Sequence, residues 1–293
     1  MKENSFKYRV FYGMIKGLAF LPLPVLYAVM APVRFVLGNL LGYRKKVIHN
    51  NLVNAFPECN PKEIKKIEKQ YYRHLCDLIA ETVKEAHISD REMAERMKIL
   101  NPEKLNEYIN EGRPVVLMLG HLGNWEWIPQ ISVWLPKDGV RMGEVYKPLR
   151  DPVWGKMMWN LRNRWNNVVQ IPQKKTVRTI IEWNREGPWV VGFISDQRPN
   201  NEDIEHKIKF FGRDIKAMVG AEGLGKKTGA AFLFVDVAKP KRGHYELTFR
   251  EILPPEDSVS KYPVTEEYYR MLENAIRRDP AIYLWSHNRW KGN

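Results

Sequence analysis

From Arg113 onward, short runs of apolar residues alternate with longer segments in which apolar residues recur every three or four positions. Runs of this kind, bounded by glycine, proline and polar residues, are typical of buried β-strands. The runs are Pro114–Leu119, Val140–Val145, Val168–Ile171, Trp189–Ile194, Ala231–Val237 and Tyr245–Ile252, and the helical segments between them include Asp151–Asn166, Lys174–Arg185 and Ala217–Thr228. This alternation predicts an α/β fold with a mostly parallel central sheet flanked by helices.

The segment before Arg113 has a helical pattern instead. Between Pro61 and His87, apolar residues recur at intervals of three and four, which predicts an amphipathic helix. Asn60 precedes this helix as a capping residue, and Pro61 suits its first turn. Further helices are expected over Arg44–Ala55, Asp90–Met97 and Pro102–Asn110.

The first forty residues are the most apolar part of the chain. Residues 17–33 carry no charge, but they are slightly fewer than the roughly 20 of a spanning helix, and Pro22, Pro24 and Pro32 interrupt them. We predict two helices, divided near Pro22 and Pro24, that lie in or on a bilayer beside the basic residues at 44–46. No small-residue cleavage site follows, so removal as a signal peptide is not expected. The alternative is an apolar helix pair packed on the main domain.

The chain is therefore expected to have two parts. Residues 1–43 form an N-terminal arm of membrane-associated helices, and residues 44–293 form one α/β catalytic domain. A length of 293 residues with 44% hydrophobic content is enough for a core of this size.

The charge of the chain limits the classes of partner. It carries a net charge of +13, from 47 Lys and Arg against 34 Asp and Glu, which indicates anionic lipid, an acidic protein or nucleic acid. Its ten tryptophans and thirteen tyrosines favour a membrane–water boundary. Cys59 and Cys76 are too few for a disulfide framework and form no CxxC pair, so we expect a reducing compartment and no zinc site.

The candidate catalytic residue follows the strand Pro114–Leu119. His121 comes directly after Gly120, at the carboxyl end of this strand, where open α/β sheets bind ligands. If His121 lies in a turn and Glu126 in the first turn of the next helix, their side chains can meet. A carboxylate on one imidazole nitrogen supports the charge gained when the other nitrogen takes a proton from a hydroxyl. The alternative is a structural histidine bonded to the backbone and a glutamate that caps a helix.

Three further residues are candidates for substrate binding. Arg164 lies on the helical segment that follows the second predicted strand, and Arg150 precedes that segment. Arginines there can bind a phosphate or a developing oxyanion. Asp196 follows the strand Trp189–Ile194, where it can orient a substrate group or anchor its own loop. A solvated helix face or a turn cap is the alternative for each.

An ordered set of motifs resembles the late lipid A acyltransferases, the lauroyl and myristoyl transferases of Gram-negative bacteria. The motifs are Asn51–Leu52 with Ala55–Glu58, Gly120–His121 through Glu126, Tyr146–Pro152, Ser195–Gln197, Phe210–Arg213 and Tyr283–Lys291. A histidine followed five positions later by an acid is unspecific alone, but the set extends over nearly the whole chain.

This resemblance implies a glycerolipid-acyltransferase-like fold and transfer of an acyl chain from acyl-acyl carrier protein to a hydroxyl of a lipid A precursor. It places the reaction at the cytoplasmic face of the inner membrane. His121 matches the family's motif histidine and Glu126 its acid, whereas Asp196 and Arg164 match family positions less closely. Backbone amides near Gly120, or Arg164, would stabilise the oxyanion.

The resemblance also implies which partners and cofactors to expect. The thioester is already activated, so no cofactor or metal is expected. The partners would be acyl carrier protein, the lipid A precursor or a related lipid, and an anionic membrane surface, with no nucleic acid. The proline-broken amino-terminal run departs from a single-pass anchor.

Two alternatives stay open on the sequence alone. The acceptor can instead be a glycerolipid, an aminolipid or another glycolipid, because no motif fixes it. A non-catalytic basic protein that binds membrane or nucleic acid through segments such as residues 283–291 also fits the charge. That second alternative gives no reason for a histidine and a glutamate around a turn at a strand end.

Overall fold

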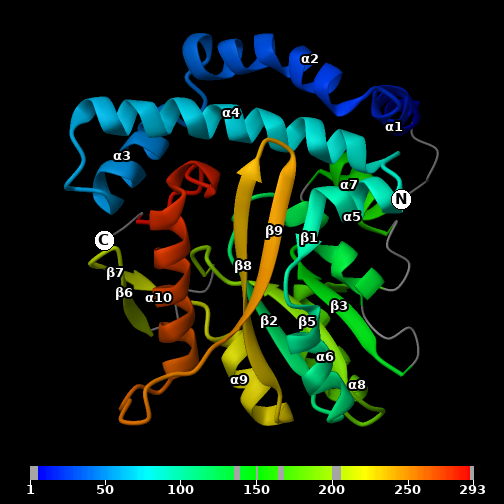
Figure 1. Cartoon of the computed structure of the whole chain (residues 1–293), viewed down its shortest axis with the longest axis vertical. Coiled ribbons are helices and arrows are strands. Elements are labelled where there is room, and N and C mark those ends of the chain that lie inside the picture. Colours follow the sequence, from blue (N-terminus) through cyan, green and yellow to red (C-terminus); the bar gives the residue numbers. More distant parts are fainter. Residues whose placement is uncertain (1–5, 135–138, 150, 164–167, 200–205, 291–293) are drawn as a thin grey trace.

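A seven-stranded sheet forms the centre of the protein in the computed structural model, which describes residues 6–134, 139–149, 151–163, 168–199 and 206–290 (Figure 1). Its strand order is β1-β9-β8-β2-β5-β3-β4. The strands are β1 (Met97–Ile99), β2 (Val115–Leu119), β3 (Arg141–Tyr146), β4 (Val168–Pro172), β5 (Trp189–Ile194), β8 (Ala231–Lys241) and β9 (His244–Glu251). Neighbours among β8, β2, β5, β3 and β4 are parallel, as are β1 and β9, and within the described part of this sheet only β8 and β9 pair antiparallel. The predicted mostly parallel sheet is confirmed.

All six strands predicted from apolar runs are present, and three short strands were not predicted. β1 has three residues. Its first residue, Met97, pairs with Tyr245, so the helix expected over Asp90–Met97 stops one residue earlier, at Arg96. The other two form a separate antiparallel hairpin, β6 (Lys207–Phe210) and β7 (Arg213–Lys216). Strands of three or four residues with charged members carry too little apolar periodicity to be recognised.

The helices agree with the pattern within a few residues, except that no helix was expected at α10. They are α1 (Phe6–Ala19), α2 (Leu23–Phe35), α3 (Lys45–Ala55), α4 (Pro61–Glu85), α5 (Asp90–Arg96), α6 (Pro102–Asn110), α7 (Pro152–Arg162), α8 (Thr176–Trp183), α9 (Gly220–Thr228) and α10 (Pro263–Arg278). Shorter helical segments are η1 (Val36–Leu40), η2 (Trp125–Trp134), η3 (Gln173–Lys175) and η4 (Pro280–Ile282). Asn60 caps α4 as predicted, because its Oδ1 accepts hydrogen bonds from the amides of Lys62 and Glu63 at 2.9 and 3.1 Å.

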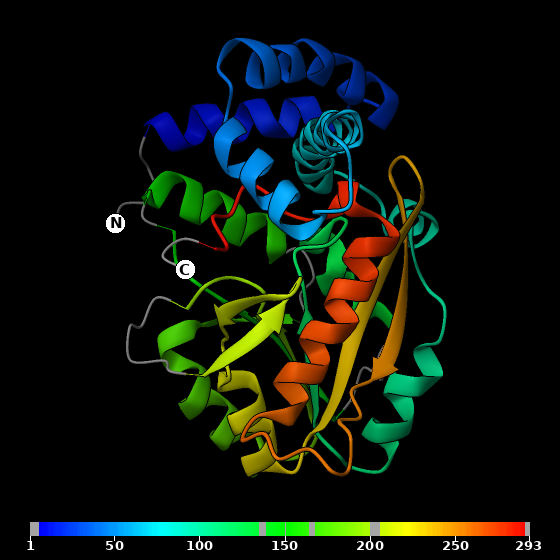
Figure 2. The same cartoon turned by 90° about the vertical axis from the view of Figure 1, so that its left-hand side faces the viewer.

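Helices cover both faces of the sheet, so its central strand is buried throughout. On one face of the sheet, α9 packs against Val116 and α10 packs against Gly120 (Figure 2). A Cβ atom at Gly120 would lie 2.5 Å from Leu272 Cδ1 of α10, so the helix and the strand are in close contact there. α7 and η2 lie over the other face, which is the face of Leu117 and Leu119. Burial on both faces explains why β2 is apolar at every position rather than at alternate ones.

The N-terminal helices lie on α4, which separates them from the carboxyl end of β8 (Figure 1). Leu23, Leu26 and Tyr27 of α2 pack against Ala80 of α4 in a small apolar cluster. Residues 20–22 are not helical and separate α1 from α2, close to the predicted division at Pro22 and Pro24. The amino-terminal helices are therefore attached to the body along one side.

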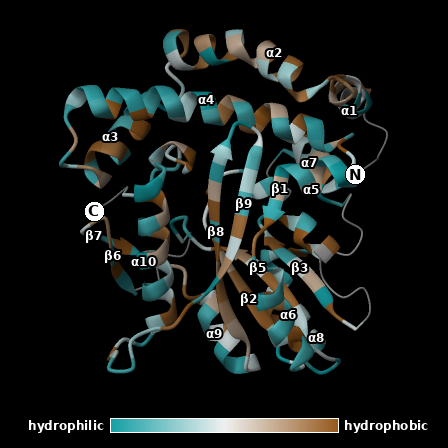
Figure 3. Ribbon diagram, in the orientation of Figure 1, coloured by the Kyte–Doolittle hydropathy of each residue, from teal (hydrophilic) through white to brown (hydrophobic). Residues whose placement is uncertain are grey.

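The opposite side of these helices exposes apolar residues at helical spacing. Phe6, Val10, Met14 and Leu18 recur every four residues on α1, and Val25, Val29, Val33, Val36 and Leu40 do so every three or four on α2 and η1. Figure 3 shows the apolar colour on α1 and α2 at the outer end of the molecule. Residues Leu23–Leu40 form 18 helical residues that are apolar and long enough, by length and composition, to cross a membrane.

Candidate active site

The turn after β2 is fixed by contacts from three directions. Gly123 has a φ of +58°, and a Cβ atom there would lie 2.7 Å from Val237 Cγ1, so only glycine fits this position. The amide of Gly123 donates to Ile282 O at 3.0 Å, and the amide of Leu284 donates to His121 O at 3.1 Å. Tyr268 of α10 donates to Leu119 O at the end of β2. The chain therefore presents His121 on a rigid turn.

His121 pairs with Asp196, not with Glu126. The His121 Nδ1 atom lies 2.6 Å from Asp196 Oδ1, and the His121 amide donates to Asp196 Oδ2 at 3.1 Å. Asp196 follows β5, which pairs directly with β2, so the two strand ends lie side by side. A carboxylate at Nδ1 favours the tautomer with the proton on Nδ1 and leaves the lone pair on Nε2. Gln197 Nε2 lies 3.3 Å from this Nε2 atom.

Asp196 is buried, with 1% of its surface exposed, and yet it stays ionised. Burial raises the pKa of Asp196, but the charge of His121 and its two hydrogen bonds, together with the charge of Arg289, outweigh burial, so the pKa falls below its usual value. The carboxylate is thus ready to support a positive charge on His121. The sequence indicates that Asp196 follows a strand, but it gives no sign that Asp196 is the partner of His121.

Glu126 binds Arg162 instead of His121. Arg162 Nε and Nη2 donate to the two carboxylate oxygens of Glu126 at 2.7 and 2.9 Å, and Trp125 Nε1 donates to Oε1 at 3.1 Å. The expected contact between His121 and Glu126 is therefore wrong, because η2 turns the Glu126 side chain toward α7. From the sequence alone, Arg164 and not Arg162 is the candidate for substrate binding, although both lie in one basic stretch. Arg150 and Arg164 lie outside the described residues.

The backbone amides of the turn are already used. The amides of His121, Leu122 and Gly123 donate to Asp196, to Gly120 O and to Ile282 O. These three amides are therefore not free to form the oxyanion site expected near Gly120. Gln197, whose side-chain nitrogen lies 3.3 Å from His121 Nε2, is a polar side chain that lines the cavity beside the imidazole.

A cavity of about 720 Å³ opens beside His121. Its floor is the sheet face with Leu117, Leu119, Met142, Glu144, Tyr146, Val168, Gln170, Gly192 and Ile194, and its roof is formed by residues of α7 and η2. His121, Glu126, Arg162 and Gln197 all line it. A mostly apolar cavity with a few polar groups is typical of a ligand site. Among the described residues, no group of three or more His, Cys, Asp or Glu is placed to hold a metal ion.

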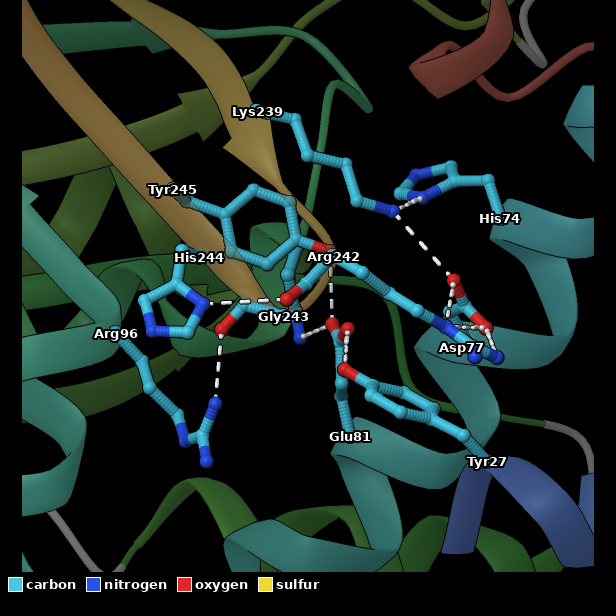
Figure 4. A network of polar contacts seen from close by, with 11 residues as sticks. Tyr27, His74, Asp77, Glu81, Arg96, Lys239, Arg242, Gly243, His244 and Tyr245 are labelled. Carbon is cyan, nitrogen blue, oxygen red and sulfur yellow. Dashed lines mark hydrogen bonds and ion pairs between the residues drawn. The ribbon is translucent and has the colours of Figure 1, made fainter. Parts of the chain in front are cut away.

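A buried polar network joins the active-site turn to α4 and the N-terminal helices (Figure 4). Glu81 of α4 accepts hydrogen bonds from Tyr27 of α2 at 2.7 Å, from Tyr245 of β9 at 2.8 Å and from Asn124, next to the His121 turn, at 2.8 Å. Burial raises the pKa of Glu81, and the charge of Lys239 together with these three donors opposes that effect. One carboxylate therefore holds together three segments that are distant in the sequence.

Glu144 is a buried carboxyl group in the cavity floor. Burial raises its pKa to about 7, the charge of Arg162 lowers it in part, and the charge of Glu126 raises it further. Because the folded chain holds this proton more tightly than the unfolded chain, stability falls as pH rises from about 4.5 to about 7 and stays reduced above that.

Glu144→Gln is expected to remove this penalty. The free energy of unfolding should rise by about 2 kcal/mol at pH 8 and change little at pH 4.5, where the carboxyl is protonated in the folded chain and about half protonated in the unfolded chain. Denaturant unfolding at the two pH values measures the difference. Glu256→Gln, at an exposed loop position, is the control. Equal effects of Glu144→Gln at both pH values would show that Glu144 ionises normally.

One family of known proteins matches this chain. The model of the family described as bacterial lipid A biosynthesis acyltransferase matches residues 6–292, almost the full length. A search of curated proteins finds no match. The match covers both strand ends that bring His121 and Asp196 together.

Proposed function

We propose, since this chain belongs to the bacterial lipid A biosynthesis acyltransferase family, that it transfers an acyl chain from acyl-acyl carrier protein to a hydroxyl of a lipid A precursor. The observation that supports this chemistry most directly is the pairing of His121 Nδ1 with the buried carboxylate of Asp196, at the wall of an apolar cavity. An imidazole oriented in this way is suited to act as a general base on a hydroxyl.

In the proposed reaction, His121 Nε2 removes the proton from the acceptor hydroxyl while the hydroxyl oxygen attacks the thioester carbonyl. Asp196 stabilises the imidazolium that forms. The tetrahedral intermediate then collapses, the carbon–sulfur bond breaks, and the leaving thiolate takes the proton from Nε2. The products are an ester and a free thiol, so no oxidant, metal or nucleotide is required.

Gln197 is the proposed donor to the oxyanion. Its side-chain nitrogen lies 3.3 Å from His121 Nε2 in the resting site. When Nε2 takes up a proton it loses its lone pair, so the Gln197 amide needs another acceptor. The developing oxyanion beside it is such an acceptor, and a donor aimed at it stabilises the transition state more than the ground state.

The site of action is proposed to be the cytoplasmic face of the inner membrane. The apolar residues exposed on α1 and α2 have the spacing of an interfacial helix face, and Arg44, Lys45 and Lys46 are exposed next to them. Because α2 is packed on α4, the arm is proposed to lie on the bilayer rather than to cross it. The net charge of +13 suits an acidic carrier protein and an anionic lipid surface.

Replacing Val25, Val29 and Val33 together with glutamate is expected to weaken binding to anionic vesicles at least about 100-fold. Each valine contributes about 1 kcal/mol of apolar burial, and the new charges are repelled by the headgroups. Vesicle flotation measures binding.

The matched control carries three glutamates at Val177, Leu253 and Val259, which are exposed on α8 and on the loop after β9, at the other end of the molecule (Figure 1). The control should bind like the wild type. Undiminished binding of the α2 variant would rule out the arm as the membrane contact.

The proposed activity is tested with purified protein in detergent, an acyl-acyl carrier protein and a lipid A precursor. Mass spectrometry should find the precursor increased by one acyl chain, in proportion to released thiol. A glycerolipid or aminolipid offered in parallel should stay unmodified. Modification of those lipids and not of the lipid A precursor would refute the proposed acceptor.

A further inference from the structure

A row of four side-by-side residues crosses the floor of the cavity. The strands pair in register, so Leu117 of β2, Gly192 of β5, Glu144 of β3 and Gln170 of β4 are direct neighbours. Because residues in register on parallel strands share one face of the sheet, all four face the cavity, which they line. The row is apolar on its β2–β5 half and polar on its β3–β4 half.

The two polar residues of this row each have an oxygen without a hydrogen-bond donor. Glu144 Oε1 and Gln170 Oε1 are inaccessible to solvent, and within the described part of the chain no group donates to either. The Gln170 amide is held in this orientation because its Nε2 donates to Trp159 O of α7 at 2.8 Å. Two neighbouring buried acceptors without a partner are rare in folded proteins.

Arg162, the cation whose charge acts on Glu144, does not satisfy them. Its Nε and Nη2 atoms are both engaged by Glu126, and it acts on Glu144 only through its charge. Glu144 is thus held in a position that costs stability at neutral pH, which is typical of a residue kept for function.

We propose that Glu144 and Gln170 form a binding site for hydrogen-bond donors, amide N–H or hydroxyl O–H groups, on a polar arm of a substrate. The alkyl part of the substrate lies on the apolar half of the floor, at Leu117, Leu119 and Ile194. This inference rests on the proposed function, since it assumes that the cavity receives acyl substrates. Beyond the proposed function, it assigns a position in the cavity to the polar arm of a substrate and names the two residues that bind it.

The position of the row indicates what kind of group reaches it. On β2 the row lies at Leu117, four residues before His121, which is about 13 Å along the strand at roughly 3.3 Å per residue. Glu144 lies two strands and Gln170 three strands across the sheet from β2, at roughly 4.8 Å per strand, so the group bound there is separated from the reacting carbonyl by a longer arm of about 16–20 Å. Two substrates have arms with such donors: the amide-containing pantetheine arm that carries the thioester, and the amide- and hydroxyl-bearing sugar lipid.

Binding is measured with unreactive probes, so that it does not depend on catalysis. For the thioester side, S-dodecyl pantetheine is compared with a dodecyl thioether of equal length that has no amides. For the acceptor side, an N-acylglucosamine lipid is compared with its N-methyl, O-methyl derivative. Isothermal titration calorimetry on the full chain in detergent gives the dissociation constants.

Wild-type protein is expected to bind the donor-bearing member of one pair about five- to tenfold more tightly than its partner. Glu144→Leu and Gln170→Leu should each reduce that ratio to near one, because they remove an acceptor. Glu144→Gln, which keeps an acceptor oxygen, should retain part of it. The pair that shows the effect identifies the substrate whose arm is bound.

Folded variants Glu144→Leu and Gln170→Leu that keep the wild-type ratio for both pairs would overturn the proposal. Should a leucine variant fail to fold, Glu144→Met and Gln170→Met, which also remove the acceptor oxygen but keep a flexible side chain of similar length, decide it: ratios unchanged from wild type with both would overturn it as well. If wild-type protein discriminates between the probes but shows no acyl transfer, the proposed function is refuted while the proposed binding site stands.

Discussion

Replacing His121 with alanine is expected to lower the rate of acyl transfer by about 10²–10⁴-fold, because the acceptor hydroxyl loses its general base. Binding of both substrates should change little, since the cavity wall loses only one imidazole. Initial rates with saturating acyl-acyl carrier protein, followed by release of the thiol, measure the effect.

The backbone contacts of the turn do not depend on the imidazole, so the variant should fold. The His121 amide still donates to Asp196, and His121 O still accepts from Leu284. Circular dichroism and vesicle binding should match the wild type. Transfer at the wild-type rate by this variant would remove His121 from the mechanism.

Asp196→Asn is expected to reduce the rate by about 10³–10⁴-fold. An asparagine amide can donate to His121 Nδ1 and so favour the tautomer with the proton on Nε2, which cannot act as a base. The imidazolium also loses the carboxylate that supports its charge. The acidic limb of the profile of kcat/KM against pH should therefore move to lower pH in this variant.

Glu126→Gln is the matched comparison, because it removes the other nearby carboxylate at equal size. It breaks the ion pair with Arg162 and is expected to lower stability by about 2 kcal/mol, while the acidic limb stays in place. The two profiles measured side by side discriminate between the pairings. A shifted limb in Glu126→Gln and not in Asp196→Asn would restore the pairing first expected from the sequence.

Local pattern was sufficient to predict most of the fold. Trp189–Ile194 was predicted as a strand with the bounds that β5 has, because a strand buried on both faces is a continuous apolar run. α6 was also predicted with its observed bounds. α10 was not anticipated, and it matters for the site because Tyr268 and Tyr269 bond the carbonyls of Leu119 and Ser195, just before His121 and Asp196.

The active site shows where local pattern is insufficient. The sequence placed His121 and Asp196 each at the carboxyl end of a strand, but it paired His121 with Glu126, the nearest acid along the chain. The order of strands in the sheet brings Asp196 to His121, across 75 residues of sequence. The polar row of Glu144 and Gln170 likewise exists only because β3 and β4 pair in one register.

The sequence by itself determined which segments are strands and helices, which of their faces are buried, and that a histidine follows a central strand. These features depend on interactions between residues a few positions apart, which periodicity records. Only the tertiary structure decided which carboxylate faces His121, which arginine faces Glu126 and which oxygens are left without donors. Those contacts join residues from different strands and helices, and their geometry is set by strand order, register and the packing of α7 and η2 on the sheet.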